Sequence, residues 1–137
     1  MDTLSQTERS RVMSLVKSKD TRPERLVRSV IHRMGYRYRL HVRDLPGCPD
    51  IVFPSRKKVI LVHGCFWHQH NCRMGRRMPK SRRTFWQRKL EGNKQRDRCQ
   101  RRKLRRRGWQ VLTVWECQLL PNQLDATLRR ISDFLEG

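Results

Sequence analysis

The sequence lacks any apolar stretch long enough to cross a membrane, since no run approaches the ~20 residues that a spanning helix needs. Residues 1–6 also lack the apolar core of a secretory signal peptide. Only 36% of the 137 residues are hydrophobic and the mean hydropathy is -0.88, so the core must come from a few well-patterned segments. These absences predict a single cytoplasmic domain of modest size with no membrane partner.

Acidic residues are also scarce, because 12 Asp and Glu stand against 33 Lys and Arg, a formal net charge of +21. Such an imbalance favours a polyanionic partner, usually nucleic acid. An anionic membrane surface is the competing partner, but it needs an amphipathic helix with a wide apolar face, which the most basic segment lacks. That segment, residues 73–107, holds 17 Lys or Arg and 2 acids, which is too dense for a merely solvated face and favours phosphate contact.

The first 35 residues carry sequence patterns that are typical of helices. Residues 3–18 have a weak basic amphipathic pattern and are expected to form an arm that orders on its partner. Thr21 and Glu24 then form a capping box, in which Thr21 accepts from a first-turn N–H and Glu24 reaches back to the cap. Apolar residues at helical spacing continue this helix as far as Gly35.

Apolar runs predict four strands, and two later segments predict helices. The sequence shows no internal repeat and no flexible linker, and its order of elements describes an α/β fold with a mixed sheet flanked by helices. The elements are strands at 36–42, 50–53 and 59–62, a basic helix at 84–107 interrupted near Gly92 and stopped by Gly108, a strand at 109–116, and a closing helix marked by Leu124, Leu128, Ile131 and Leu135.

Residues 63–72 gather two cysteines and three histidines directly after an apolar run. Thiolates and imidazoles are the ligands that zinc prefers, and a structural site needs four in a tetrahedron. This segment can supply three, and Cys117, which ends a second apolar run, is the expected fourth. His63, His68 or both are then free for another role. The alternative is two buried cysteines with solvated histidines, because the cysteine spacing is looser than the common Cys-x2-Cys.

The five cysteines are an odd number, and in a reducing compartment they indicate metal ligands or buried thiols before disulfides. Cys48 and Cys99 have no ligand-like neighbours in the sequence. We expect both to be structural.

A hairpin joins the strands at 50–53 and 59–62. If it turns symmetrically about Arg56 and Lys57, Asp50 lies opposite His63 on one face of the sheet, whereas a one-residue slip would separate them. A carboxylate there is a hard oxygen ligand for magnesium, and together with two histidines it indicates phosphodiester hydrolysis. Taken alone, Asp50 is more often a turn carboxylate.

Three aromatic residues stand among these polar segments, Phe66 and Trp67 between the cysteines and Trp86 in the basic helix. They are either ordinary core residues or a wedge pushed between base pairs, as in some DNA-bending proteins. In a polar loop Phe66 and Trp67 have little sequence-local core to join.

Together these residues resemble the very short patch repair (Vsr-type) DNA mismatch endonuclease family of bacteria, over nearly the whole chain. The motifs that carry the resemblance are Gly-Cys-Phe-Trp-His at 64–68 with His63, His70 and Cys72 around it, Pro-Gly-x-Pro-Asp at 46–50, the helix at 86–97, Val-Trp-Glu-Cys at 114–117, Arg-Ser-x-x-Met at 9–13, and Thr-x-x-Glu at 21–24.

The resemblance implies a restriction-endonuclease-like fold with structural zinc, in which residues 1–20 form a DNA-contacting arm and residues 21–137 the catalytic domain. Members of the family use magnesium to nick the strand 5′ of the thymine in a T:G mismatch, which arises when 5-methylcytosine deaminates. The expected partner is mismatched double-stranded DNA, bound by a monomer in the bacterial cytoplasm at the nucleoid. Other DNA repair proteins are candidate partners.

The resemblance also implies a role for each matched residue. Asp50 and the carbonyl of Val62 would bind magnesium, His63 and His68 would act on metal-bound water and as general base, Asp97 would orient a histidine, and Glu24 would have an accessory place. Cys65, His70, Cys72 and Cys117 would bind zinc. Phe66, Trp67 and Trp86 would intercalate beside the mismatch, Lys89 and Asn93 would contact its bases, and Met13 would contact DNA from the arm.

Three features depart from common patterns. Position 48 is Cys where relatives usually have Arg, which weakens a contact beside Asp50. Val62 replaces a Thr of some members, but a backbone carbonyl does not depend on the side chain. The Lys of the commoner nuclease motif is absent from the end of the third strand, where His63 stands instead.

Two other classes of function compete with an endonuclease. A non-catalytic, zinc-stapled DNA-binding and bending module would use the same zinc and aromatic residues, and magnesium would not change its DNA. A basic RNA-binding protein would prefer single-stranded RNA to a mismatched duplex.

Overall fold

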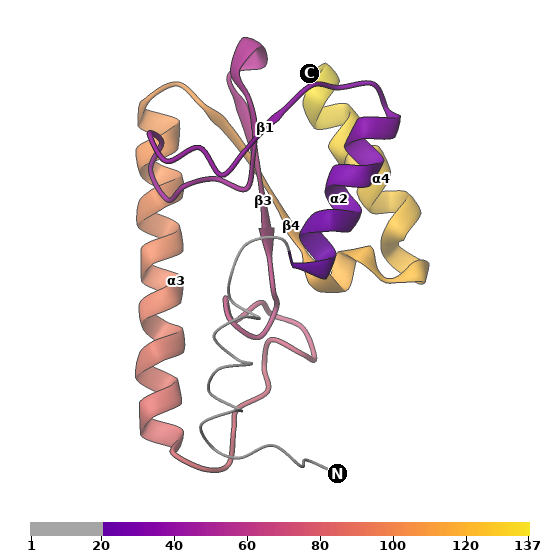
Figure 1. The fold of residues 1–137 in the computed structure, drawn as a ribbon. Helices are drawn as coiled ribbons and strands as arrows, with labels where there is room; N and C mark the ends of the chain where they lie inside the picture. The colour runs from indigo at the N-terminus through magenta and orange to yellow at the C-terminus, as the bar shows by residue number, and fades with distance from the viewer. Residues whose placement is uncertain (1–20) are drawn as a thin grey trace.

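The computed structural model describes residues 21–137, which form a four-stranded mixed sheet between two layers of helices (Figure 1). Helix α3 lies on one side of the sheet, and α2 and α4 lie together on the other. The expected N-terminal arm and its Met13 lie outside the described residues. Within residues 21–137, no helix is long and apolar enough to cross a membrane.

The sheet has the order β1-β2-β3-β4, with β1, β2 and β3 antiparallel and β4 parallel to β3. A helix, three strands, a helix and a strand form the core in the predicted order, so the mixed α/β, restriction-endonuclease-like fold is confirmed. The elements are α2 (Arg22–Arg33), β1 (Arg39–Leu40), β2 (Ile51–Phe53), the 3-10 turn η1 (Pro54–Arg56), β3 (Lys58–His63), α3 (Arg83–Arg106), β4 (Gln110–Trp115), the 3-10 turn η2 (Glu116–Leu119) and α4 (Pro121–Glu136).

Two apolar clusters hold these layers together. In β2, Ile51 and Phe53 point into the cluster under α2 and α4, while Val52 points into the cluster under α3. Helices on both faces therefore explain why the central strands are continuous apolar runs and do not alternate with polar residues. The first cluster contains Val27, Ile31, Ile51, Phe53, Ile60, Val114, Ile131 and Leu135, and the second Val52, Val59 and Leu104.

Helix α2 begins at the predicted cap. The Thr21 hydroxyl accepts a hydrogen bond from the Glu24 N–H at 3.4 Å, and Gly35 ends this segment with a left-handed φ of 88°. The second half of the predicted capping box is wrong, because the Glu24 carboxylate turns towards the sheet and pairs with Arg28. Glu24 is only 3% exposed, so its charge belongs to a buried site.

The β2–β3 hairpin is shifted by two residues from the predicted register. Pro54–Arg56 and a left-handed Lys57 make the turn, so Ile51 pairs with Ile60. A two-residue shift keeps every side chain on its original face. Asp50 therefore still shares a face with His63, although the two do not lie directly opposite each other.

The predicted strand at 36–42 shrinks to the two residues of β1 because His41 adopts a left-handed backbone, with φ 49°. Such a conformation cannot continue a strand. His41 N–H still donates to the Asp50 carbonyl at 3.2 Å. The kink thereby carries the His41 ring towards the start of β2 and not along the sheet.

Two further expectations are corrected. Helix α3 passes through Gly92 without a break, because one glycine costs only about 1 kcal/mol relative to alanine in a long helix. Lys58 belongs to β3 and not to the turn, and its buried Nζ donates to the carbonyls of Phe134 and Gly137 at the end of α4. A cation at that end complements the helix dipole.

Candidate active site and metal centres

Three groups of ionisable side chains gather around the ends of β3 and β4 and the start of β2. Two of the groups border a cleft of about 780 Å³ between α2, the 46–48 loop and α3. In each group the candidate ligand atoms lie within 4.8 Å of one another. The three groups are Cys65, His70, Cys72 and Cys117; His63, His68 and Asp97; and Glu24, His41 and Asp50.

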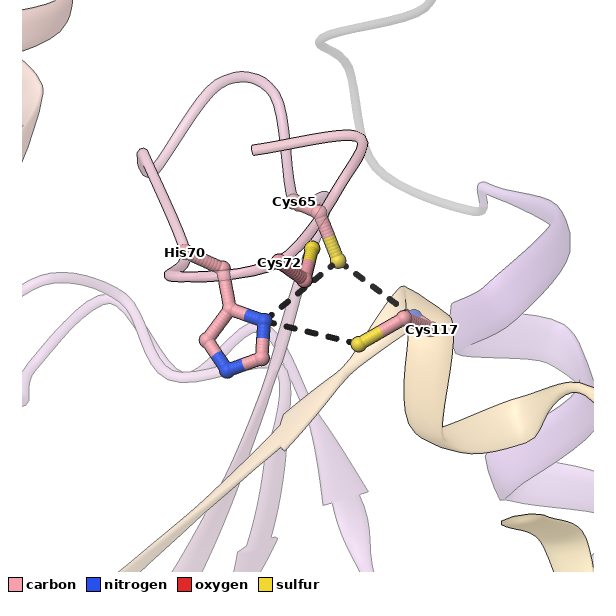
Figure 2. A group of neighbouring side chains, drawn as sticks. All are labelled: Cys65, His70, Cys72 and Cys117. Carbon is pink, nitrogen blue, oxygen red and sulfur yellow. Dashed lines mark hydrogen bonds between the residues drawn. The ribbon is translucent and has the colours of Figure 1, made fainter. Parts of the chain in front are cut away.

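The first group is the predicted set of four zinc-type ligands (Figure 2). His70 Nδ1 lies 3.9 Å from Cys65 Sγ and 3.4 Å from Cys117 Sγ. Neighbouring S and N ligands of a tetrahedral zinc are separated by about 3.6 Å, as the usual Zn–S and Zn–N bond lengths require. The donor set and its spacing fit zinc, so this Cys3His cluster suggests a structural zinc site.

Backbone N–H groups donate hydrogen bonds to two of the sulfurs in this cluster, which favours the thiolate form that binds a cation. Cys117 N–H donates to Cys65 Sγ and Gly75 N–H donates to Cys72 Sγ, each at 3.3 Å. Burial raises the pKa of Cys65 to about 12. Burial also acts to raise the pKa of Cys72, but the Gly75 N–H and neighbouring thiols outweigh it and leave that pKa lowered. A bound cation would stabilise all three thiolates together.

The second group joins two stacked imidazoles to a carboxylate. The rings of His63 and His68 are parallel, with centroids 3.8 Å apart, and His68 Nδ1 makes a short hydrogen bond to Asp97 Oδ2. Burial and then the neighbouring His68 lower the pKa of His63 to about 3. His63 is therefore neutral at physiological pH, and His68 is the imidazole that a carboxylate orients.

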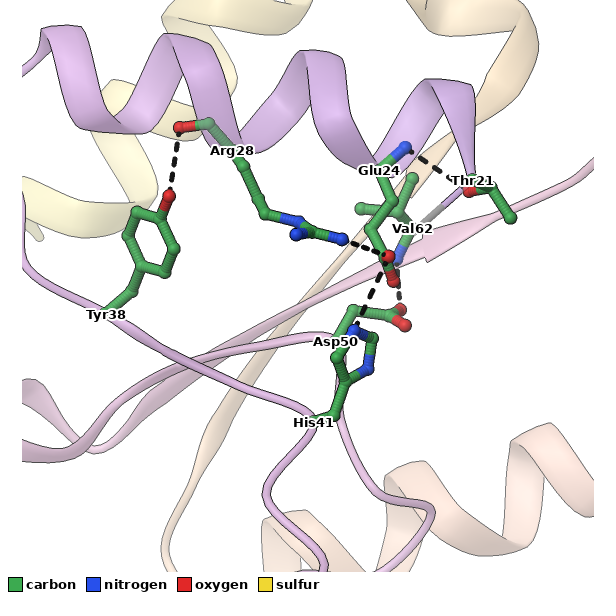
Figure 3. Close-up of polar contacts among 7 residues, drawn as sticks. All are labelled: Thr21, Glu24, Arg28, Tyr38, His41, Asp50 and Val62. Carbon is green, nitrogen blue, oxygen red and sulfur yellow. Dashed lines mark hydrogen bonds and ion pairs between the residues drawn. The ribbon is translucent and has the colours of Figure 1, made fainter. Parts of the chain in front are cut away.

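The third group contains the buried carboxylate of Glu24 and the half-buried carboxylate of Asp50 (Figure 3). Asp50 Oδ2 accepts a hydrogen bond from Val62 N–H at 2.8 Å, and Glu24 Oε2 lies 2.6 Å from Arg28 Nη2 and 3.6 Å from His41 Nε2. Burial, and next the hydrogen bond with Glu24, raise the pKa of Asp50 to about 8. Two adjacent carboxyl groups that share a proton in this way form a site that favours a divalent cation.

His41 is a site residue that sequence reasoning missed. It was assigned only to an alternating strand, and its left-handed φ is what turns its ring to Glu24. A histidine just before a turn-rich loop that ends in Asp50 was the available signal, because His is among the residues that enter the left-handed region more readily.

The predicted aromatic residues form one cluster beside the cleft. Trp67 and Trp86 each lie 5.8 Å or less from the Phe66 ring centroid, and their own centroids are 5.8 Å apart. The cluster thus joins the 64–70 loop to the first turn of α3. Phe85, which sequence reasoning missed, packs against Trp86 at 5.5 Å and is 44% exposed.

The comparison with protein families decides what kind of site this is. The family model for DNA mismatch endonuclease Vsr matches residues 1–74, which is more than half of the chain. The chain belongs to the Vsr DNA mismatch endonuclease family. It is accordingly an endonuclease, a hydrolase whose substrate is DNA.

Three relatives align with nearly the whole chain. Type II nicking enzyme V.XorIIP of Xanthomonas oryzae pv. oryzae is 53% identical over 133 residues, covering 96% of this chain and 97% of that protein. Type II nicking enzyme V.NmeAIP of Neisseria meningitidis serogroup A is 39% identical over 137 residues, covering 96% and 97%. DNA mismatch endonuclease Vsr of Escherichia coli is 38% identical over 139 residues, covering 99% and 88%.

In this Vsr-family chain, most of the predicted site residues border one cleft. The cleft is lined by Glu24, Asp50, Val62, His63, His68 and Asp97, with Phe66, Trp67 and Asn93 at the aromatic side. The four residues of the zinc-type cluster are not among the described residues that line the cleft.

Two predicted DNA contacts on α3 have partners within the protein. Asn93 Nδ2 donates to the Trp67 carbonyl at 3.0 Å, which fixes the aromatic loop against the helix. Lys89 Nζ lies 5.8 Å from the centroid of the Phe85 ring. Contact of Lys89 and Asn93 with bases stays a prediction.

Cys48 and Cys99 are both exposed, so the expectation that they serve in the structure is wrong. Cys48 has a left-handed φ of 48° and borders the cleft of this Vsr-family enzyme. It precedes the buried Pro49, which holds Asp50 at the start of β2.

Proposed function

We propose that this Vsr-family endonuclease nicks the DNA strand 5′ of the thymine in a T:G mismatch, by magnesium-dependent hydrolysis. The observation that carries the proposal is a single cleft lined by a pair of carboxylates, by a carboxylate-oriented histidine and by part of an aromatic cluster. The N-terminal arm at 1–20 is proposed to add DNA contacts, and residues 21–137 to form the catalytic domain.

Asp50 and the carbonyl of Val62 are the proposed magnesium ligands, with Glu24 as an accessory group. In a strand, the N–H and C=O of one residue point to the same side. Because Val62 N–H donates to Asp50, the Val62 carbonyl faces the same space. A magnesium ion there would neutralise charge on the scissile phosphate and activate water. Hard oxygen donors, with the pKa of Asp50 raised by burial and by the adjacent Glu24, fit that ion.

His68 is the proposed general base. Its hydrogen bond to Asp97 fixes the orientation of the ring and stabilises the imidazolium that forms when the ring takes a proton. His63 is a weaker proton acceptor because burial lowers its pKa to about 3. Its stacked ring instead supports His68 and forms part of the cleft floor.

Phe66, Trp67 and Trp86 are the proposed mismatch-sensing wedge. A T:G pair stacks and pairs less well than a matched pair, so opening the duplex there costs less, by a few kcal/mol of unstacking at most. The cluster borders the cleft and is tied to α3 by Asn93, which gives the wedge a rigid base. Selectivity then follows from DNA deformability as well as from base contacts.

We expect Trp67→Ala to lose preference for the mismatch. Base–aromatic stacking contributes roughly 1–3 kcal/mol, so the ratio of T:G to T:A nicking should fall by about 10- to 100-fold. The measurement is single-turnover nicking of a T:G duplex and of a T:A duplex of otherwise identical sequence. The control is Trp109→Ala, which changes a tryptophan just before β4, at the other end of that strand from the site. An unchanged ratio in Trp67→Ala would remove it from the wedge.

The names of two relatives support a second candidate substrate. V.XorIIP and V.NmeAIP are named type II nicking enzymes, so nicking tied to a defined recognition sequence is the alternative to general T:G repair. Placing the T:G pair in several flanking sequences separates the two. Cleavage in one context alone supports recognition-site nicking.

The carboxylate pair predicts a specific pH dependence of stability. A carboxyl whose folded pKa is raised stabilises the fold below its unfolded pKa of 3.8 and loses that stabilisation as the pH rises towards about 8. Without magnesium, the melting temperature of the zinc-loaded protein should therefore fall as the pH rises from about 4 to about 8 and level off above that. Added magnesium should offset the fall, and most strongly at the alkaline end.

The control for this prediction is Asp50→Asn, which should flatten the dependence because the shared proton is gone. Differential scanning fluorimetry of both proteins, with and without magnesium, measures it. Equal slopes in the two proteins would assign the pH dependence to other groups.

Zinc is the proposed occupant of the Cys65, His70, Cys72 and Cys117 cluster, where it would hold the 64–72 loop to the end of β4. We also propose that the protein acts as a monomer on double-stranded DNA. Contact with other DNA repair proteins stays a prediction.

A further inference from the structure

One aromatic residue touches both histidine clusters. The indole of Trp115 stacks on the ring of His70, with centroids 4.2 Å apart and planes inclined by 14°. Its other neighbours are the catalytic-site rings, His63 at 5.2 Å and His68 at 6.3 Å, both nearly perpendicular to it. The four rings therefore form one continuous packed unit that runs from the zinc-type cluster to the cleft.

The strands fix Trp115 in this position. It is the last residue of β4 and pairs in parallel register with His63, the last residue of β3. Its backbone N–H also donates to Gln118 Oε1 at 3.1 Å, which ties it to η2 and so to the turn that carries Cys117. The backbone of Trp115 is thereby held at the ends of both central strands.

Trp115 lies behind the wall of the cleft. His63 and His68 line the cleft, whereas Trp115 is not among the described residues that do. It is therefore placed to act on the substrate only through the two imidazoles. His63 in turn has a buried Nδ1 for which the described part of the chain offers no hydrogen-bond partner, so its ring is held by packing alone.

We propose that Trp115 is a positioning residue that sets the His63–His68 stack by bracing it against His70 of the metal cluster. Metal binding fixes His70, His70 fixes the indole plane, and the indole edge fixes His63, on which His68 lies. The cluster thereby contributes to the geometry of the reaction as well as to folding. This inference rests on the proposed function for its kinetic part only.

The test compares Trp115→Leu and Trp115→Phe with Trp109→Leu, which removes a second half-buried indole just before the same strand. Four quantities are measured: zinc content, DNA affinity, the ring 15N and 1H resonances of the histidines, and the single-turnover nicking rate. Trp115→Leu should keep its zinc and its DNA affinity, shift the resonances of His63 and His68, and slow nicking by about 10- to 100-fold, because small misplacements of a catalytic group cost that much.

A flat ring is the property required, so Trp115→Phe should recover most of the rate and of the wild-type resonances. Trp109→Leu should leave both unchanged even where its melting temperature falls as far. If Trp115→Leu does not fold, Trp115→Met, which also lacks a flat ring, carries the test, with the same shifts expected for His63 and His68.

Wild-type resonances and rate in Trp115→Leu or, should it not fold, in Trp115→Met would overturn the inference. So would slowing that accompanies zinc loss to the same extent in the Leu and Phe variants, since Trp115 would then only support the metal cluster. If wild-type protein itself does not nick T:G duplexes, the proposed function fails. The histidine resonances and zinc content still decide the positioning role in that case.

Discussion

Replacing Asp50 with asparagine should slow nicking of mismatched DNA by about 10³-fold or more, because a catalytic cation supplies several kcal/mol of charge stabilisation in the transition state. Asparagine keeps the shape of the side chain and an oxygen that accepts from Val62 N–H, but it loses the anionic donor. It also removes one of two adjacent carboxyl groups that share a proton. The variant should therefore fold normally and still bind mismatched duplex.

The control for this variant is Asp44→Asn, which changes an exposed carboxylate on the loop before Asp50. Single-turnover nicking and duplex binding are measured for both proteins. Wild-type nicking by Asp50→Asn would contradict the proposed cation site. Binding without cleavage by the wild-type protein would favour the DNA-bending module.

Replacing Cys117 with serine should remove zinc and lower the melting temperature by about 10 °C or more, since structural zinc contributes folding free energy directly. Cys117 is the one ligand of the proposed set that comes from outside the 64–72 loop. Its Sγ lies 3.4 Å from His70 Nδ1, and its N–H donates to Cys65 Sγ. Without its thiolate, the cluster has no ligand from the end of β4 to bind a metal held by the 64–72 loop.

Cys99→Ser is the matched control, because Cys99 is an exposed thiol on α3 and belongs to none of the ligand groups formed by residues 21–137. Zinc is counted by elemental analysis and stability by thermal melts. One zinc per chain that persists in Cys117→Ser would exclude Cys117 from the site.

The four residues of the Cys3His cluster could be predicted from the sequence for a physical reason. Three of its members sit within one short loop, and the fourth ends a neighbouring strand, so a single correct strand pairing brings Cys117 to Cys65. Residue chemistry and element type are local properties. Both are encoded by composition and spacing alone.

The carboxylate site was only partly predictable, because turn geometry and side-chain direction depend on tertiary contacts. Strand alternation places Asp50 and His63 on the same face of the sheet. That prediction is correct even though the predicted hairpin register differs by two residues from the observed one. The place of His41 depends on one left-handed residue, and the direction of Glu24 on burial beside Arg28. Neither leaves a pattern in the sequence.

Helix α3 also shows a difference between what the sequence predicts and what tertiary packing produces. Glycine propensity predicts a break near Gly92, but α3 has a buried leucine on either side of it, Leu90 and Leu104, and Leu104 packs against β2 and β3. Tertiary packing outweighs a propensity difference of about 1 kcal/mol. The unbroken helix matters for function, since it places Trp86, Asn93 and Asp97 along the same wall of the site.

The most direct test is nicking of an end-labelled duplex with one T:G pair, beside its T:A twin, with magnesium and then with EDTA. We expect a single magnesium-dependent cut 5′ of the mismatched thymine, in that strand only and in the T:G duplex only. Equal cutting of both duplexes, or no cut despite tight binding to both, would contradict mismatch-specific hydrolysis by this cleft.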